Sequence, residues 1–313
     1  MRRRIGEAVL GLVVGGGLFV WALRDFPWEG LLMVPRTWFW LVAGGMIMTV
    51  AHVLRAWRWQ LMLRASGVTS DGVAPWWALM VGYLANLVLP RVGELLRCTL
   101  LWRWRRIPVA ISLGSVVAER LIDVGVLGIL AISVVAVEGL GWLDLLHLKA
   151  YLPYILGGIG IAGLVLWLLW RFWLQKRSEA WLKQLISGFF SAASVRPRGL
   201  MVGLSFGIWV GYWGAIVGVM LAYQRAGEEM LLSSILWAGW VLLVGSGLAM
   251  ALPVPGGIGT FHAIGLLLLL SVGWQKPLAQ LTVVAAHALQ TLLVIVLGGM
   301  GVVYGLSSGQ RRV

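Results

Sequence analysis

Charged and polar side chains interrupt an apolar stretch of the sequence, where they could bind a charged group. Residues 82–97 read GYLANLVLPRVGELLR and contain Asn86, Arg91, Glu94 and Arg97. Glu94 and Arg97 are spaced i, i+3, so a helix would place both on one face. An ionised group at the bilayer centre costs at least about 2.5–3.5 kcal/mol on insertion scales and therefore needs partners or water. These residues form a candidate binding site, and an ion pair that only fastens the turn is the alternative.

A second polar cluster lies in the apolar stretch at about 111–137 and consists of Glu119, Arg120 and Asp123. Helical spacing places Glu119 and Asp123 on one face, and Arg120 is also within reach of Asp123. A functional role and a purely structural ion pair stay open here. The two clusters together carry equal numbers of arginines and carboxylates. An anionic headgroup could therefore compete with the acids for the arginines, whose planar fork suits phosphate.

A glycine-rich turn, PVPGGIG at residues 253–259, enters a third polar segment that contains His262. Such a turn can present free N–H groups at the positive end of a helix dipole, although tight hairpin packing is the alternative. Its candidate anion-binding residues are Gly256, Gly257 and Gly259. His262 begins its helix as Glu94 begins the earlier one. It could exchange a proton near neutral pH, or it could be a packed, hydrogen-bonded histidine.

Other chemistries have little support in the sequence. The four histidines show no metal-ligand spacing, and the single Cys98 excludes an internal disulfide framework. No nucleophile elbow of the form Gly-x-Ser-x-Gly occurs. We therefore expect no metal and no cofactor. A proton could still be exchanged at Glu94, Asp123 or His262.

The composition excludes a soluble globular protein. Of the 313 residues, 60% are hydrophobic and only 12% are charged, with a mean hydropathy of +0.90, whereas soluble domains carry about 25% charged residues. The net charge of +13 does not indicate a nucleic-acid partner, because the cations form short clusters between long apolar runs. This pattern is typical of a polytopic membrane protein.

Six apolar stretches are long enough to cross a bilayer, which takes about 20 residues. They lie at about 8–23, 37–56, 111–137, 151–170, 200–222 and 278–304. Two further stretches, 73–101 and 231–272, are broken by Pro90 and by the turn at 253–259. Each broken stretch could be two full spans or one re-entrant hairpin.

The distribution of positive charge favours hairpins. With two hairpins and a cytoplasmic N-terminus, most of the 25 lysines and arginines fall on the cytoplasmic side. That side includes the Arg- and Trp-rich segments 55–59 and 102–106, which we interpret as interfacial anchors. If only the first broken stretch spanned, later basic loops would change sides and weaken this bias.

The sequence thus predicts an all-α polytopic membrane protein with about six transmembrane helices plus two re-entrant helical hairpins. The chain forms a single domain, residues 1–313, with an inverted-topology repeat at about 8–137 and 151–305. Residues 178–194 should form an interfacial helix between the halves. The expected location is the cell (inner) membrane, with both termini in the cytoplasm.

The polar motifs resemble the flippase-like membrane domain of lysylphosphatidylglycerol synthases and its stand-alone relatives. The resemblance rests on NLVLPRVGELLR at 86–97, ERLID at 119–123 and PGGIG at 255–259, and it covers about residues 8–305. It implies movement of lipids across the bilayer, including aminoacylated phosphatidylglycerol, other phospholipids or polyprenyl-phosphate-linked sugars. Many relatives have Glu in place of His262. No aminoacyl-transferase domain follows within the 313 residues, so the resemblance implies translocation more than synthesis.

Three functional hypotheses follow, and a lipid translocase leads. Its partners would be membrane lipids, either an anionic phospholipid or a polyprenyl-phosphate-linked lipid, and a homodimer is left open. The first rival is a membrane enzyme acting on a lipid-linked phosphate or sugar, with Glu94 or Asp123 as base. The second is a non-transporting scaffold, in which neutralising the buried charges would be tolerated.

Overall fold

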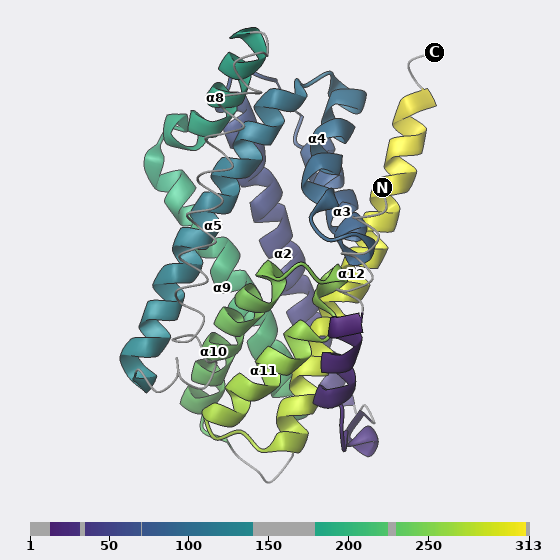
Figure 1. The fold of residues 1–313 in the computed structure, drawn as a ribbon, viewed down its shortest axis with the longest axis vertical. Coiled ribbons are helices and arrows are strands. Elements are labelled where there is room, and N and C mark those ends of the chain that lie inside the picture. Colours follow the sequence, from purple (N-terminus) through teal and green to yellow (C-terminus); the bar gives the residue numbers. More distant parts are fainter. Residues whose placement is uncertain (1–12, 32–34, 70, 140–178, 225–229, 311–313) are drawn as a thin grey trace.

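The computed structural model describes residues 13–31, 35–69, 71–139, 179–224 and 230–310 (Figure 1). Within these residues the regular secondary structure is helical and includes no strand. The span predicted at 151–170 lies outside the described residues. The span predicted at 8–23 is described as a helix at Val13–Ala22.

Five of the described helices are long and apolar enough to cross a membrane. They are α2 (Pro35–Ala65), α5 (Val109–Glu138), α9 (Arg198–Tyr223), α10 (Leu232–Ala251) and α12 (Lys276–Gln310). Four of them contain predicted spans, and the shortest, α10, belongs to the second broken stretch. Its 20 residues correspond to about 30 Å, the thickness of the hydrocarbon core. The protein is therefore an all-α polytopic membrane protein.

Close helix packing depends on small residues. Helices α2 and α9 lie side by side, and a Cβ on Gly218 would be 3.2 Å from the Cα of Gly44. Helix α8 (Glu179–Ser194) packs along α5, where a Cβ on Gly188 would overlap the carbonyl of Ile111. Without a hydrophobic force between helices in lipid, such close backbone contact supplies the packing energy. The helix predicted at 178–194 is confirmed, and its interfacial location stays a prediction.

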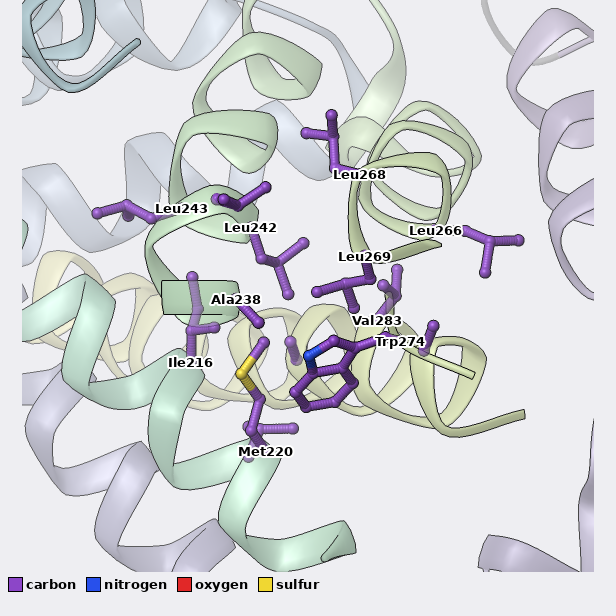
Figure 2. Close-up of a cluster of buried hydrophobic side chains, with 14 of the residues drawn as sticks. Ile216, Met220, Ala238, Leu242, Leu243, Leu266, Leu268, Leu269, Trp274 and Val283 are labelled. Carbon is purple, nitrogen blue, oxygen red and sulfur yellow. The ribbon is translucent and has the colours of Figure 1, made fainter. Parts of the chain in front are cut away.

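The largest hydrophobic cluster lies among α9, α10, α12 and α11 (Thr260–Ser271) (Figure 2). Met220 of α9, Leu242 of α10 and Leu269 of α11 are almost fully buried there. Figure 2 shows the Trp274 indole beside these aliphatic side chains. This cluster fixes the second broken stretch against the long helices.

Both broken stretches form pairs of packed helices that turn back at the break. Helix α3 (Val73–Val88) packs on α4 (Val92–Arg105), and α10 packs on α11. At 1.5 Å per residue, α3 and α4 measure about 24 and 21 Å, each less than a bilayer core. Figure 1 shows α3 and α4 in the upper half of the molecule and α10 and α11 in the lower half.

The tips of the two helix pairs touch. A guanidinium nitrogen of Arg91, in the first tip, donates to the carbonyl oxygen of Ala251 at a distance of 2.5 Å. A Cβ on Gly256 in the second tip would be 3.2 Å from the side chain of Leu87. The breaks at residues 89–91 and 252–259 therefore lie against each other.

Candidate functional site

The charged residues of α4 and α5 form one buried network. Glu119 is fully buried, and Asp123 lies one helical turn further along the same face of α5. Arg97 of α4 is 2% exposed, and its Nη1 is 3.1 Å from Oε2 of Glu119. The structure thus brings together residues that the sequence placed in two separate motifs.

Helix α2 adds two arginines to this network. The Nε of Arg55 donates to Oε1 of Glu119 at 2.9 Å, and its Nη2 donates to Oδ2 of Asp123. Arg58 donates to Oδ1 of Asp123 at 2.7 Å and to the hydroxyl of Ser205 at 2.9 Å. Each acid is therefore held by at least two arginines, one or both of which come from α2.

The interpretation of residues 55–59 as an interfacial anchor was wrong. Helix α2 does not end near Ala56 but continues to Ala65, so Arg55 and Arg58 lie within the helix. Arg58 and Trp59 are fully buried. The apolar residues Leu61, Met62 and Leu63 beyond this segment were a signal that the helix continues, and the i, i+3 spacing of the two arginines indicated a shared face.

Removing one partner from such a network is costly. Breaking a buried ion pair costs about 3–5 kcal/mol, because the remaining charge stays buried without compensation.

Arg97 also lies over the Trp59 ring, with 4.5 Å between its Cζ and the ring centroid. Its three guanidinium nitrogens have no well-aligned hydrogen bond among the described residues. Arg97 therefore retains donors for a further acceptor.

Polar side chains extend the network toward α9. Nη1 of Arg55 donates to the Tyr212 hydroxyl at 3.4 Å, and this hydroxyl is 3.4 Å from Nδ1 of His52. His52 also packs against the ring of Tyr83. Sequence reasoning did not identify these residues, since a lone histidine or tyrosine in an apolar helix carries no local signal.

The outer part of the network consists of Arg120 and Glu94. Nη2 of Arg120 is 3.5 Å from Oε1 of Glu94, and the side chains are 42% and 24% exposed. Asn86 donates to Oε2 of Glu94 at 3.5 Å and accepts from the Gly93 N–H at 2.7 Å. Asn86 thus orients Glu94 and satisfies a backbone donor at the start of α4.

The site carries more positive than negative charge. Arg91 is exposed, adopts a left-handed backbone with φ of 65°, and donates to the Ala251 carbonyl instead of a carboxylate. Arg91 therefore lies outside the network, in which four arginines (Arg55, Arg58, Arg97 and Arg120) face three carboxylates. The equal balance expected from the sequence is thus corrected to an excess of one positive charge in the network.

The second tip is built from glycines whose backbone other residues adopt only with strain. Its three glycines, Gly256, Gly257 and Gly259, have φ values of 58°, 70° and 85°. The Gly257 N–H donates to the Val254 carbonyl at 3.1 Å, and the Gly259 N–H donates to Nδ1 of His262 at 3.3 Å. These donors already have partners within the turn, and anion binding here stays a prediction.

His262 lies apart from the arginine network. It is 3% exposed, and its ring centroid is 4.7 Å from that of His287 and 4.8 Å from that of Phe19. Nε2 of His287 is 2.9 Å from the Gly256 carbonyl oxygen. Among the described residues, no ion pair or hydrogen bond joins His262 to the acids of α4 and α5. The two polar regions are therefore chemically distinct.

Within the described ranges, no group of three or more His, Cys, Asp or Glu residues is placed to hold a metal ion.

The model of the lysylphosphatidylglycerol synthase transmembrane region family matches residues 8–298. The chain belongs to this family. A comparison of this chain with curated proteins and with solved structures finds no match. Membership in the lysylphosphatidylglycerol synthase transmembrane region family confirms the resemblance seen in the three motifs, all of which lie within the matched residues, and makes the chain a multi-pass membrane protein of a lipid-related family.

Proposed function

We propose that the protein is a lipid translocase that moves an anionic or phosphate-bearing lipid across the bacterial cytoplasmic membrane. The observation that carries this proposal is the excess of one positive charge in a largely buried network beside the first helix pair. An anionic headgroup would neutralise this excess. The lipid-related family supports the same conclusion.

The network contains arginines that could bind a phosphate and a carboxylate, Glu119, that competes with the phosphate for these arginines. Arginine donates two parallel hydrogen bonds to phosphate, and Arg97 has donors without aligned partners. Glu119 pairs with Arg55 and Arg97 and would compete with a phosphate for them. A phosphate that replaces this carboxylate gains hydrogen bonds, while the acyl chains stay in the hydrocarbon.

The same proposal includes an inverted repeat with two re-entrant hairpins. The α3–α4 hairpin would enter from the cytoplasm and the α10–α11 hairpin from outside, with both termini cytoplasmic. The contact between the tips at Arg91 and Ala251 supports this arrangement. Rocking of the halves around the meeting point would expose the site alternately to the two sides, as in other inverted-repeat transporters.

The pairing of the acids favours transport over base chemistry. Both oxygens of Glu119 and both oxygens of Asp123 are paired with guanidinium groups, so neither carboxylate presents a free oxygen to a substrate. In a scaffold without transport, the arginines would have no need to exchange their carboxylate partners for another anion. Both rivals predict that wild-type protein moves no lipid.

The test is lipid movement in proteoliposomes. Wild type, Arg97→Lys and Arg103→Gln would be compared with labelled phospholipids and a labelled polyprenyl phosphate. Arg97→Lys keeps the charge but loses the planar fork, so we expect a rate roughly tenfold lower. Arg103 lies exposed near the end of α4, and its substitution should leave the rate unchanged. Folded wild type that moves no lipid of the panel would contradict the translocase.

A further inference from the structure

The charged network has an open side and a closed side. Arg97 and Glu119 are 2% and 0% exposed, whereas Arg120 and Glu94 are 42% and 24% exposed. The guanidinium of Arg120 is 3.9 Å from Glu119 and 4.0 Å from Asp123. The Arg120–Glu94 pair therefore lies between the molecular surface and the buried acids.

The surface around this pair is apolar. Within four residues of Glu94 or Arg120 in the chain, large hydrophobic side chains are exposed, including Leu95, Val117, Leu121 and Val124. In a membrane-spanning helix, such side chains contact lipid tails. A charged pair in this surface lacks the water that would normally solvate it, and charges at this depth need polar partners.

We propose that the Arg120–Glu94 pair is a lateral entrance where the phosphate of a membrane lipid is first captured between α4 and α5. This inference rests on the proposed function and adds the route and the capturing residue. The phosphate replaces Glu94 at Arg120, because it can accept two parallel hydrogen bonds from the guanidinium group. The acyl chains lie against the apolar side chains on either side, such as Leu95 and Leu121.

The next step inward follows from the distances. A phosphate on Arg120 is adjacent to Glu119, which pairs with Arg97 on its other side. Arg97 is almost fully buried, and its three nitrogens lack aligned hydrogen bonds among the described residues. The phosphate therefore passes from an exposed arginine to a buried one whose donors remain available.

This arrangement gives the two entrance residues opposite effects. Arg120 binds the phosphate, whereas Glu94 competes with the phosphate for Arg120. Arg120→Gln should weaken capture, and Glu94→Gln should strengthen it. If the pair only held α4 and α5 together, both substitutions would act in the same direction, since each would remove the same ion pair.

The experiment measures capture without transport. The full chain, in a phosphate-free maltoside detergent, would be photolabelled with phosphatidic acid that carries a diazirine near its glycerol, and labelled peptides would be quantified by mass spectrometry. We expect labelling around Leu121 to exceed labelling around Ile132, which is an even more exposed apolar residue further along α5. Labelling at Leu121 should fall about tenfold in Arg120→Gln, rise in Glu94→Gln, and stay unchanged in the exposed α4 control Arg103→Gln.

Competitors identify the source of the phosphate. Unlabelled phosphatidic acid should abolish labelling, while diacylglycerol and soluble glycerol phosphate should not. Equal labelling at Leu121 and Ile132, or a fall in both entrance variants, would overturn the entrance. Competition by glycerol phosphate would assign the site to a free phosphate compound instead of a lipid.

Transport rates separate this inference from the proposed function. Selective labelling at Leu121 in a protein that moves no lipid would support the entrance and contradict the translocase. Lipid movement at equal rates in wild type and Arg120→Gln would support the translocase and overturn the entrance. Each proposal can therefore fail without the other.

Discussion

The tips of the two helix pairs place an ionisable side chain at the same helical position, in opposite surroundings. Glu94 is the third residue of α4, and His262 is the third residue of α11. Glu94 is partly exposed and contacts Asn86 and Arg120. His262 is buried, accepts a backbone N–H and packs against aromatic rings.

This difference shows that a repeated backbone form does not require repeated chemistry. The first tip faces acids and arginines of three helices and carries the excess positive charge. The second tip satisfies its polar groups within the turn and packs on α12 through His287. One tip therefore carries partly exposed charged groups, and the other is a buried turn whose polar groups are paired.

The largest effect should come from removing an acid of the charged network. Glu119→Gln leaves Arg97 without its carboxylate, so we expect the free energy of unfolding to fall by about 3–5 kcal/mol. Denaturant titration of tryptophan fluorescence in micelles would measure it. The double variant Glu119→Gln, Arg97→Met removes both partners and should recover part of the loss. A loss below about 1 kcal/mol in the single variant would contradict the ionic description of the first tip.

A methyl group in the second tip should have the next largest effect. Gly259→Ala forces a φ of 85° on alanine and places its Cβ against the Gly15 carbonyl oxygen. The strain alone costs about 1–3 kcal/mol, measurable as a lower thermal midpoint. Gly16→Ala is the control, because nothing lies within 4 Å of its Cβ and alanine favours helix. Equal midpoints for both variants would argue against a rigid second tip.

The role of His262 can be resolved by two substitutions. Asparagine has a side-chain oxygen that can accept the Gly259 N–H, whereas leucine has none. His262→Leu should therefore be less stable than His262→Asn by about 1 kcal/mol, the value of one hydrogen bond. Unfolding in micelles would compare them. Equal stability would mean that ring packing, not the hydrogen bond, explains the histidine.

The smallest effect should come from the Asp71–Arg105 ion pair, which is partly exposed and lies outside the spans, in contrast to the buried network. Partial burial opposes ionisation of Asp71, but hydrogen bonds from Arg105 outweigh it and hold the pKa of this carboxyl below its usual range. Its stabilisation is thus present above the unfolded-state pKa and is lost as pH falls through the folded-state value. Asp71→Asn should cost under about 1 kcal/mol at pH 7 and progressively less below pH about 4. An undiminished difference at pH 3 would contradict this account.

The sequence was sufficient to find the acids and two arginines of the network, because charges stand out between apolar residues. It did not reveal Arg55 and Arg58, whose Arg-Trp pattern resembles that at residues 102–106. The structure buries the first two arginines and leaves Arg103 and Arg106 exposed. The difference depends on acids more than 60 residues away in the chain, which local spacing cannot show.

A left-handed backbone conformation could be predicted from the sequence where the residue is glycine. The turn at 253–259 has left-handed residues at three of its glycines. The first tip instead uses Arg91 in the left-handed region, where a residue other than glycine is uncommon. Its contact with Ala251 depends on the second tip, so the sequence near Arg91 alone could not indicate it.

Helix α12 runs beside both helix pairs and has a mechanical consequence. About a third of the way along α12, His287 contacts the Gly256 carbonyl, and further along Gly298 and Gly301 allow close contact with α3. Both helix pairs therefore pack on the same helix. A Cβ on either glycine would lie within 3 Å of α3, so a larger residue there would force α3 away from α12. A displacement of α12 would therefore change its contacts with both helix pairs at once.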